Sequence, residues 1–386
     1  MKRIGIDCRL WSEAGVGRYI RNLVKSLAEI DHENEYYLFL LKKNLPQNLP
    51  ENFHCIEANF SWYTMAEQVK FPKLLHSYKL DLMHFPHFNV PVFYQGKFIV
   101  TIHDLIHQHF KMERATTHGR LVYKVKQLAY GRVFSHAIKK SQLVITVSEY
   151  VKKQLQNEWK LKPNKIVVTK EAAEDSLIKL AQRMTENGVG QVLKKFQITR
   201  PYIFYVGNAH PHKNVEGLIK AFLKLVTSHQ EPEISPNNAS LAIDSGKLKL
   251  VLAGNDHYFW KRIKKEYQHP NIVYTGFVTD LELVGLYKGA EVYVVPSFEE
   301  GFGIPLLEAF VCGVPVVSSK LGSLTEVGGE AALYFDPNNS QDMADKIWTV
   351  LSDKKIEKKL IESGEKRYQQ FSWKSLALQT LNVYVN

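Results

Sequence analysis

Residues 291–318 are Glu291-Val-Tyr-Val-Val-Pro-Ser-Phe-Glu-Glu-Gly-Phe-Gly-Ile-Pro-Leu-Leu-Glu-Ala-Phe-Val-Cys-Gly-Val-Pro-Val-Val-Ser318. The apolar, β-branched runs at its two ends predict strands over 291–296 and 314–318. The segment between them predicts a helix over 304–312. A strand, a helix and a second strand in this order are the building block of a parallel sheet.

The turn between the first strand and the helix carries its own signals. Gly301 and Gly303 let the backbone turn tightly and present its amides. Pro305 suits the first turn of a helix, where a missing N–H is harmless, and Gly313 suits the helix end. The amides at such a helix start form a ready site for a phosphate.

The same alternation of strands and helices runs through the whole chain, and it predicts an α/β protein with parallel sheets covered by helices on both faces. Strands are expected in the first half over 2–7, 36–41, 54–57, 81–85, 97–102, 142–147 and 165–169, and in the second over 202–206, 248–253, 272–275, 291–296, 314–318 and 332–335. Helices are expected over 17–30, 117–140, 148–158, 215–227, 280–289 and 304–312.

Two domains are predicted, one over 1–185 and one over 200–371. The polar stretch 171–200 lacks strand patterning and marks the boundary, while 228–247 is expected to be a surface insertion. Ser372 is a helix-start signal for a terminal helix over 372–386.

Composition is that of an ordinary globular protein, with 45% apolar and 23% charged residues among 386. No apolar run approaches the ~20 residues of a transmembrane helix, and no signal peptide is predicted at the start. Three widely separated cysteines, Cys8, Cys55 and Cys312, indicate neither a disulfide framework nor a metal cluster. A reducing cytoplasmic location is expected.

Positive charge is concentrated in the first part of the chain. Residues 1–170 hold 26 Lys and Arg against 14 Asp and Glu, a net charge of +12, and the remainder has a net charge of −1. This predicts an anionic partner such as a membrane surface or a lipid phosphate. A solvated surface without a partner is the alternative. No nucleic-acid partner is expected, because no zinc-finger or RNA-binding signature is present.

Glu300 and Glu308 flank the glycine turn and its helix start. Two fixed acceptors beside a phosphate cradle predict a ligand with a phosphate and several hydroxyls, as in a nucleotide sugar. Two solvated acids at a helix start are the alternative.

A second glycine pair, Gly15-Val16-Gly17, follows the first predicted strand. Its amides could approach a phosphate or a sugar, or the pair could form only a tight turn. The dinucleotide-binding fingerprint does not fit, because its third glycine would fall on Ile20.

His103 and Asp104 end the strand over 97–102, where side chains of a parallel sheet face a ligand crevice. His103 could exchange a hydrogen bond with a sugar hydroxyl, or Asp104 could simply cap the next segment.

The second domain opens with a strand followed by Gly207-Asn-Ala-His-Pro-His-Lys213-Asn214. A glycine turn with a lysine at the following helix start can hold a diphosphate. A solvated lysine is the alternative.

Several of these motifs together resemble the retaining glycosyltransferases of family four, most closely bacterial mannosyltransferases of surface polysaccharide synthesis. The resemblance rests on Gly15–Tyr19, His103–Leu105, Gly207–Asn214, Gly276–Val278, Pro296–Ala309, Cys312–Val317 and Gly322–Val327. It implies the GT-B fold, in which two Rossmann-like domains face a cleft, and a C-terminal helix that packs back on the first domain.

The resemblance also implies roles for individual residues. Glu300, His103 and Lys213 are the expected catalytic residues, with Glu300 on the donor-sugar hydroxyls and Lys213 on the diphosphate. The expected donor-binding residues are Gly15, Val16, Gly17, Asp104, Gly207, Asn208, Lys213, Phe277, Val278, Gly301, Phe302, Gly303, Ile304 and Glu308. Asn208 stands where many relatives have an arginine, and Arg18 or His212 is the candidate substitute for that charge.

The expected reaction moves a sugar, best assigned as mannose from GDP-mannose, to a glycan or lipid-linked acceptor with retention at the anomeric carbon. UDP sugars remain open as donors. Glu300 as a covalent nucleophile is disfavoured, because the family reacts on the front face. No Asp-x-Asp motif is present, so no essential metal and no other cofactor are expected. Peripheral contact with the inner face of the plasma membrane would suit the basic first half.

Two alternatives differ in class: a sugar-nucleotide epimerase of the same fold, and a non-catalytic subunit that binds a nucleotide sugar.

Overall fold

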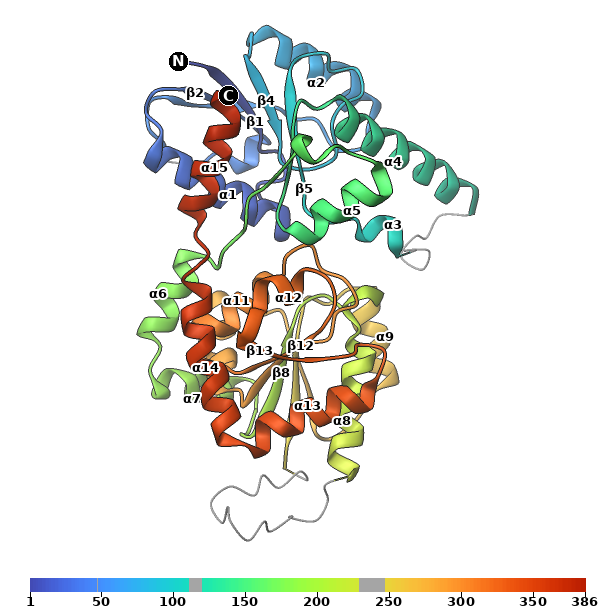
Figure 1. Ribbon diagram of the computed structural model, residues 1–386, viewed down its shortest axis with the longest axis vertical. Coiled ribbons are helices and arrows are strands. Elements are labelled where there is room, and N and C mark those ends of the chain that lie inside the picture. Colours follow the sequence, from blue (N-terminus) through green and yellow to red (C-terminus); the bar gives the residue numbers. More distant parts are fainter. Residues whose placement is uncertain (47, 111–119, 229–246) are drawn as a thin grey trace. The chain divides into compact units, whose positions relative to one another are not determined.

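The computed structural model describes residues 1–46, 48–110, 120–228 and 247–386, and the side chains of these residues except 120–127. The chain forms two compact units (Figure 1). Unit 1 is Met1–Glu171 with Ser372–Asn386, and unit 2 is Ala172–Phe371. The start of the helix predicted over 117–140 and nearly all of the insertion predicted over 228–247 lie outside the described residues.

Unit 1 is built on a seven-stranded sheet in the order β3-β2-β1-β4-β5-β6-β7. Every neighbouring pair is parallel. The strands are β1 (Arg3–Asp7), β2 (Glu35–Leu40), β3 (Phe53–Glu57), β4 (Leu82–Phe85), β5 (Phe98–Ile102), β6 (Val144–Thr146) and β7 (Ile166–Val168). All seven predicted strands are confirmed. All residues of β4, β5 and β6 are buried, as expected for strands covered on both faces.

The helices of unit 1 are α1 (Gly15–Ile30), α2 (Met65–Ser77), α3 (Ile106–His109), α4 (Arg120–Lys140), α5 (Glu149–Trp159) and α15 (Trp373–Val385). The short 3₁₀ turns η1 (Lys42–Asn44) and η3 (Pro163–Lys165) lie between β2 and β3 and between α5 and β7. The C-terminal helix α15 packs beside α1 (Figure 1). The Tyr384 hydroxyl lies 2.6 Å from Nδ1 of His84 on β4, which ties α15 to the buried sheet.

Unit 2 has a six-stranded parallel sheet in the order β10-β9-β8-β11-β12-β13. Its strands are β8 (Tyr202–Val206), β9 (Lys249–Ala253), β10 (Ile272–Gly276), β11 (Val292–Val295), β12 (Val316–Ser319) and β13 (Ala332–Phe335). Its helices are α6 (Asp175–Arg183), α7 (Glu186–Lys195), α8 (Val215–Ser228), α9 (Tyr258–Glu266), α10 (Asp280–Gly289), α11 (Ile304–Val311), α12 (Ser323–Gly328), α13 (Ser340–Ser352) and α14 (Lys354–Tyr368), with 3₁₀ turns η4 (Pro211–Lys213) and η5 (Gly329–Ala331). The predicted strands of this half are confirmed as well.

The boundary between the units differs from the predicted one. The units divide after Glu171, so residues 172–185 belong to unit 2 and not to the first domain. The polar stretch 171–200, which was expected to mark the boundary, folds into α6 and α7. Its apolar residues include Val189, Val192 and Leu193, which fall at helical spacing and are buried on one side of α7. A narrow apolar stripe is enough to dock a helix. The many polar residues around this stripe made it hard to recognise in the sequence.

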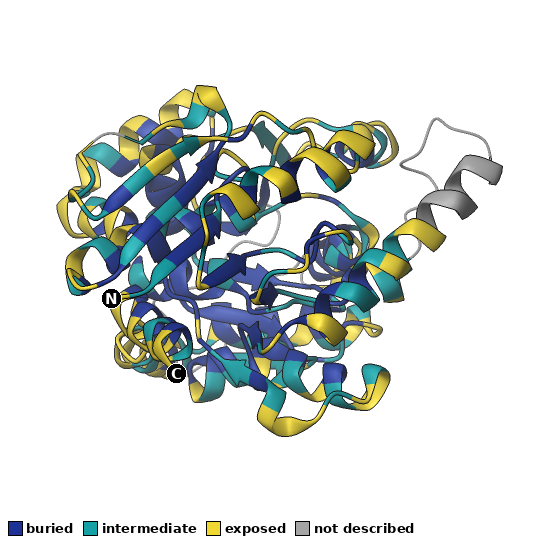
Figure 2. Ribbon diagram, turned by 90° about the horizontal axis from the view of Figure 1, so that it is seen from above, coloured by how far each residue is buried: buried dark blue, intermediate teal, exposed yellow. Residues whose placement is uncertain are grey.

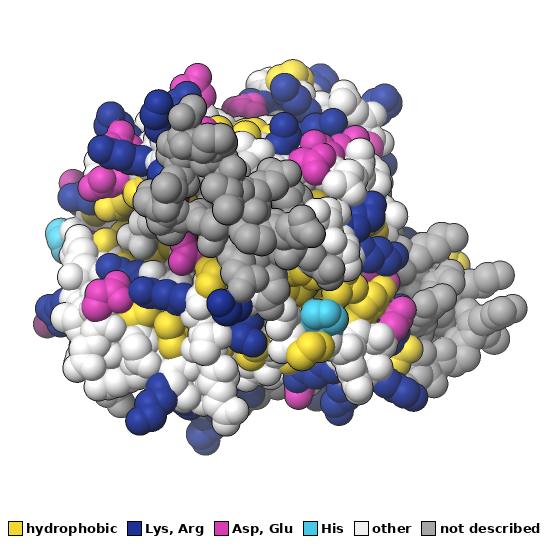
Figure 3. Space-filling view, turned by 90° about the horizontal axis from the view of Figure 1, so that it is seen from below, with side chains coloured by type: hydrophobic (Ala, Val, Ile, Leu, Met, Phe, Trp, Pro, Cys, Tyr) yellow, Lys and Arg dark blue, Asp and Glu magenta, His cyan; other side chains and the backbone are white. Residues whose placement is uncertain are grey.

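Each unit has its own apolar core, and the inner strands of each sheet, such as β5 and β11, are buried throughout (Figure 2). Helices expose their outer faces in the same view. On the face seen from below, Lys and Arg side chains are interspersed with Asp and Glu (Figure 3). Within the ranges given above, no helix is long and apolar enough to span a bilayer.

Candidate functional site

In unit 2, three predicted site segments follow the carboxyl ends of parallel strands. Residues 207–214 follow β8, residues 277–278 follow β10, and residues 296–304 follow β11. Because β8 and β11 are neighbours, the first and third segments meet at one edge of the sheet.

Lys213 and Glu300 form the centre of this edge. Lys213 Nζ lies 2.7 Å from each carboxylate oxygen of Glu300, and the side chains are only 19% and 13% exposed. The Ser297 hydroxyl donates to Glu300 Oε1 at 2.6 Å. The Ser323 hydroxyl donates to the main-chain oxygen of Glu300 at 2.8 Å. Lys213 and Ser297 therefore hold the carboxylate, and Ser323 holds the main chain of Glu300. Neither serine was predicted as a partner, because hydroxyl partners leave no spacing signal in the sequence.

Asn214 fixes the turn that carries Lys213. It adopts a left-handed conformation with φ of 52°, which asparagine tolerates better than most residues. Its amide Nδ2 donates to the main-chain oxygens of Pro296 at 3.1 Å and Pro337 at 2.9 Å. The first bond joins the turn after β8 to the turn after β11, which places the lysine against the glutamate, and the second joins the same turn to the segment after β13.

Gly303 begins helix α11 as predicted. Its φ is +104°, and a Cβ there would lie 2.8 Å from a side-chain carbon of Leu324. Pro305 lies in the first turn, and no side chain of the described residues caps this helix start. Pro305 has no N–H and the Leu306 N–H is bonded to the Gly303 main-chain oxygen at 3.0 Å, so the amides up to Ile304 are the ones placed to meet an anion.

Glu308 lies inside α11 and is 2% exposed. The Tyr287 hydroxyl lies 3.2 Å from its Oε2. Tyr287, on α10, was another partner that the sequence did not reveal. After β10, Gly276 turns the chain with φ of +73°, Phe277 is 70% exposed and Val278 is half-buried.

Asn208 is held within its own turn. Its Oδ1 accepts the backbone N–H of His210 at 3.3 Å, and the Tyr205 hydroxyl donates to its main-chain oxygen at 2.7 Å. The imidazole of His210 lies nearly parallel to those of His212, at 5.9 Å between ring centres, and His257, at 5.2 Å. Of the two candidate replacements for the family's arginine, His212 is thus in this unit and beside this turn, whereas Arg18 belongs to unit 1.

In unit 1, Gly15, Val16 and Gly17 form the first turn of α1. The predicted helix start at residue 17 was two residues late, so the glycine pair belongs to the helix start itself. A Cβ on Gly17 would lie 2.7 Å from the main-chain oxygens of Leu10 and Trp11. Glycine is therefore required for close packing of the preceding turn. Nothing lies within 4 Å of a Cβ built on Gly15.

His103 follows β5 and is held on both ring nitrogens. Nε2 lies 2.9 Å from the main-chain oxygen of Pro86, and Nδ1 lies 3.4 Å from Glu171 Oε1. Burial alone would lower the pKa of His103, but the hydrogen bond and negative charge of Glu171 outweigh it, and the net shift is upward. Asp104 accepts the N–H of Ile106 at 3.0 Å, which is the capping role weighed as its alternative.

Both units match known protein families. Residues 14–170 match the family model described as Glycosyltransferase Family 4, and residues 192–367 match the model described as Glycosyl transferases group 1. The chain belongs to the glycosyltransferases that combine these two domains, and the predicted GT-B fold class and family are confirmed.

Among its relatives, O-antigen chain mannosyltransferase B of Escherichia coli is 29% identical over 96% of this chain and 95% of that protein. The serotype-specific mannosyltransferase WbdA of Escherichia coli is 30% identical over 47% of this chain, and the match spans only 21% of WbdA. Anabaena Alr3699/HepE, solved in complex with UDP-glucose, has a TM-score of 0.72 at 15% identity over the full length of both chains. That likeness shows the fold.

Proposed function

We propose that this glycosyltransferase moves mannose from GDP-mannose to a glycan or lipid-linked acceptor in surface polysaccharide synthesis, with retention at the anomeric carbon. The observation that carries the proposal is the Lys213–Glu300 pair beside the uncapped start of α11. The near full-length similarity to O-antigen chain mannosyltransferase B supports the choice of mannose and of polysaccharide as the product class.

Without a donor, Lys213 and Glu300 pair with each other and carry no net charge together. We propose that a bound nucleotide sugar separates them and becomes the partner of both. The diphosphate takes the Lys213 ammonium, and Glu300 then accepts hydrogen bonds from the donor-sugar hydroxyls. Ser297 can remain on Glu300 throughout, because it is bonded to only one carboxylate oxygen. The backbone of Gly301, Phe302, Gly303 and Ile304 adds amides to the same diphosphate.

Departure of the nucleoside diphosphate builds negative charge as the glycosidic bond breaks. Lys213 and the α11 amides stabilise that charge where it develops, and one such donor typically contributes about 2.7–4 kcal/mol to the barrier. These groups already supply positive charge, so we propose a reaction that needs no metal or other cofactor.

Other donor contacts follow the family pattern. We assign the ribose to Glu308, the base to Phe277 and Val278, and the diphosphate turn to Gly207 and Asn208. Phe277 is exposed enough to stack on a base, whereas Glu308 is buried and would need Tyr287 to share it.

In unit 1, we assign His103 to a donor-sugar oxygen. The upward shift of its pKa favours the imidazolium, whose two N–H groups face the Pro86 oxygen and Glu171, so a sugar oxygen would replace one of these two acceptors. Gly15, Val16 and Gly17 offer the first amides of α1, and Ala14 before them supplies no side-chain cap. Asp104 supports this segment as a cap and is the weaker donor-binding candidate.

A panel of nucleotide sugars tests the donor. GDP-mannose should raise the melting temperature more than GDP-glucose or UDP-glucose, because a ligand of the native state stabilises it. Product analysis with and without a mannosyl acceptor separates transfer from the alternatives. Conversion of the donor alone would indicate an epimerase, and binding without turnover with any acceptor would indicate a binding subunit.

The basic first half supports peripheral contact with anionic lipid at the inner face of the plasma membrane. Flotation with phosphatidylglycerol vesicles should occur at low salt and weaken at high salt, because surface charge interactions are screened. Vesicles of neutral phosphatidylcholine are the control. Failure to float at low salt would remove the membrane part of the proposal.

A further inference from the structure

Unit 1 contains a pocket of about 780 Å³ that none of the donor contacts uses. It lies between the start of α2, the segment after β4 and the middle of α4. Its walls include Tyr63, Met65, Phe88, Phe93 and Tyr130, with Asn89 as a polar member. Mostly apolar and aromatic walls with a few fixed polar groups are typical of a small-molecule site.

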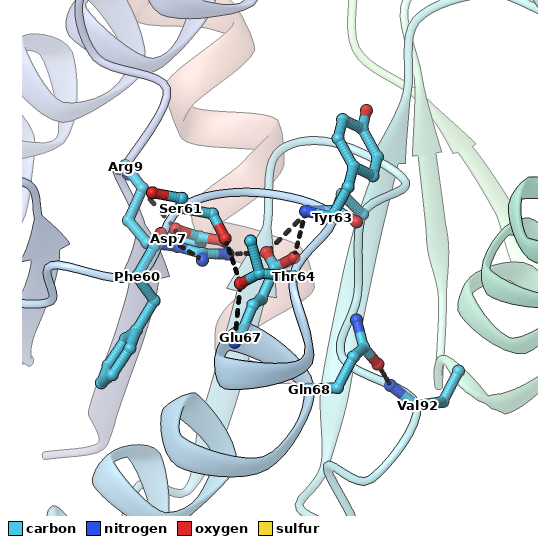
Figure 4. Close-up of polar contacts among 10 residues, drawn as sticks. Asp7, Arg9, Phe60, Ser61, Tyr63, Thr64, Glu67, Gln68 and Val92 are labelled. Atoms are coloured by element: carbon cyan, nitrogen blue, oxygen red, sulfur yellow. Dashed lines mark hydrogen bonds and ion pairs between the residues drawn. The ribbon is translucent and has the colours of Figure 1, made fainter. Parts of the chain in front are cut away.

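A buried ion network adjoins the residues of this pocket (Figure 4). The Arg9 guanidinium lies 2.7 Å from Asp7 Oδ2 and 2.8 Å from Glu67 Oε1. Arg9 is 1% exposed, Glu67 is fully buried, and the guanidinium also lies over the ring of Phe71. Burying charges is costly unless geometry and hydrogen bonds compensate. Here the compensation comes from a cluster that fixes Glu67 in one position.

Glu67 in turn orients two residues of the pocket. Its Oε2 accepts the backbone N–H of Tyr63 at 2.7 Å, and its Oε1 accepts Nδ2 of Asn89 at 2.7 Å. A carboxylate can only accept, so the Asn89 amide is fixed with Nδ2 towards Glu67. Asn89 is 5% exposed, and its Oδ1 has no hydrogen-bond partner within the described part of the chain. A buried, unpaired acceptor that borders a pocket points to a ligand with a hydroxyl or amide donor.

Tyr63 is unusual in backbone as well as in exposure. Its φ of 60° lies in the left-handed region, which is unfavourable for an aromatic residue, and such strain clusters at functional sites. The side chain is nevertheless 69% exposed, and Phe93 across the pocket is 57% exposed. In Figure 4 the Tyr63 ring points away from Glu67 while the backbone N–H is held. The network thus presents an aromatic ring that packs on little of its own protein.

We propose that this pocket binds a pyranose residue of the acceptor glycan. The C–H face of the sugar packs on Tyr63 and Phe93, since polarised C–H groups are attracted to the negative face of an aromatic ring. One sugar hydroxyl donates to Asn89 Oδ1, which it reaches after a small shift of the wall that covers this atom. An alkyl chain of a lipid carrier would fill the same volume but leave Oδ1 unpaired, so the chemistry favours the saccharide.

The proposal rests on the proposed glycosyl transfer, and binding without donor tests it separately. The probe is methyl α-mannobioside, followed by saturation-transfer NMR with the full chain. Tyr63→Asn removes the ring and suits a positive φ, and Phe93→Ala removes the second ring. Each should weaken binding about tenfold or more, whereas Tyr63→Phe should retain it. Leu378→Ala, at an exposed apolar position on α15 of the same unit, is the matched control and should bind within about twofold of wild type.

Three results would overturn the pocket assignment. The first is no saccharide signal with wild type, and the second is unchanged binding in both ring variants. The third is displacement of the saccharide by farnesyl phosphate, together with loss of farnesyl phosphate binding in Tyr63→Asn. The rise in melting temperature that GDP-mannose causes should be the same in these variants as in wild type. Loss of saccharide binding with intact donor binding supports the pocket. Donor failure in wild type with ring-dependent saccharide binding would refute the proposed donor chemistry and leave the pocket standing.

Discussion

Lys213 and Glu300 are 87 residues apart in the chain, yet the lysine Nζ lies 2.7 Å from both carboxylate oxygens of the glutamate. The contact exists because β8 and β11 are adjacent parallel strands whose following turns share one edge. A nearly buried ion pair of this kind is a poor stability device, because desolvation offsets much of the attraction. In the proposed function, its value lies in keeping two oppositely charged groups ready for a ligand that carries both a diphosphate and hydroxyls.

Replacing Lys213 by Ala should reduce the rate of mannosyl transfer by about 10²–10³-fold, because one donor to the departing diphosphate is lost. The measurement is kcat with GDP-mannose and a mannosyl acceptor. Lys224→Ala, at an exposed position of α8, is the control and should keep the wild-type rate. Equal rates for the two variants would show that Lys213 does not stabilise the leaving group.

Glu300→Gln keeps the size of the side chain and its capacity to accept from Ser297 but removes the negative charge. Hydrogen bonds to a charged group contribute about 1.5–3 kcal/mol, so kcat/KM should fall by about 10–100-fold. Because Lys213 loses its carboxylate partner in this variant, calorimetry without acceptor should also show a changed affinity for free GDP. Glu330→Gln, an exposed acid on η5, serves as the matched variant. Retained activity in Glu300→Gln would argue against a role in donor-sugar binding.

Glu171→Gln should lower the pKa of His103, because the charge that holds the imidazole proton is removed while burial remains. The upper limb of the pH–rate profile should therefore move to lower pH if His103 acts as a proton-bearing donor. NMR titration of His103 measures the shift directly. A profile that stays in place while the NMR pKa falls would separate His103 from catalysis.

The interaction of His103 with Glu171 also makes the folding stability depend on pH. The folded-state pKa of His103 is raised above the ordinary value of 6.5. The stabilisation is therefore full below about pH 6.5 and is lost as pH rises through the folded-state pKa. Urea unfolding across this range should show a smaller pH dependence in Glu171→Gln than in wild type.

Gly303→Ala should destabilise unit 2 by about 1–3 kcal/mol, because alanine is strained at a φ of +104° and its Cβ meets Leu324. The free energy of unfolding in urea measures the loss, and GDP-mannose should raise the melting temperature less than in wild type. Gly190→Ala in α7 is the control, since it has a helical backbone and nothing within 4 Å of the added Cβ. That variant should be neutral or slightly stabilising. Similar losses in both variants would show that the special backbone of Gly303 is not the cause.

Local sequence signals were sufficient for most elements. The helix over 280–289 was predicted to the residue, and Thr279 and Glu282 form a reciprocal capping box at its start. Strands of both sheets were predicted because buried parallel strands are short, continuous apolar runs. Errors fell where local composition misleads. The polar α6 and α7 dock through only a few apolar residues, and the glycines at 15 and 17 belong to the first turn of α1.

By itself, the sequence determined the α/β class, the glycine turns and the family, since these depend on periodicity and motifs that lie within a few residues of one another. Only the tertiary structure decided that Lys213 contacts Glu300, that Glu171 holds His103, and that Arg9 and Glu67 orient Tyr63 and Asn89. The physical reason is that such pairs depend on strand order and on which side chains share a buried edge. Hydrogen-bond partners far apart in the chain leave no local pattern, although they set the geometry and the charge of the site.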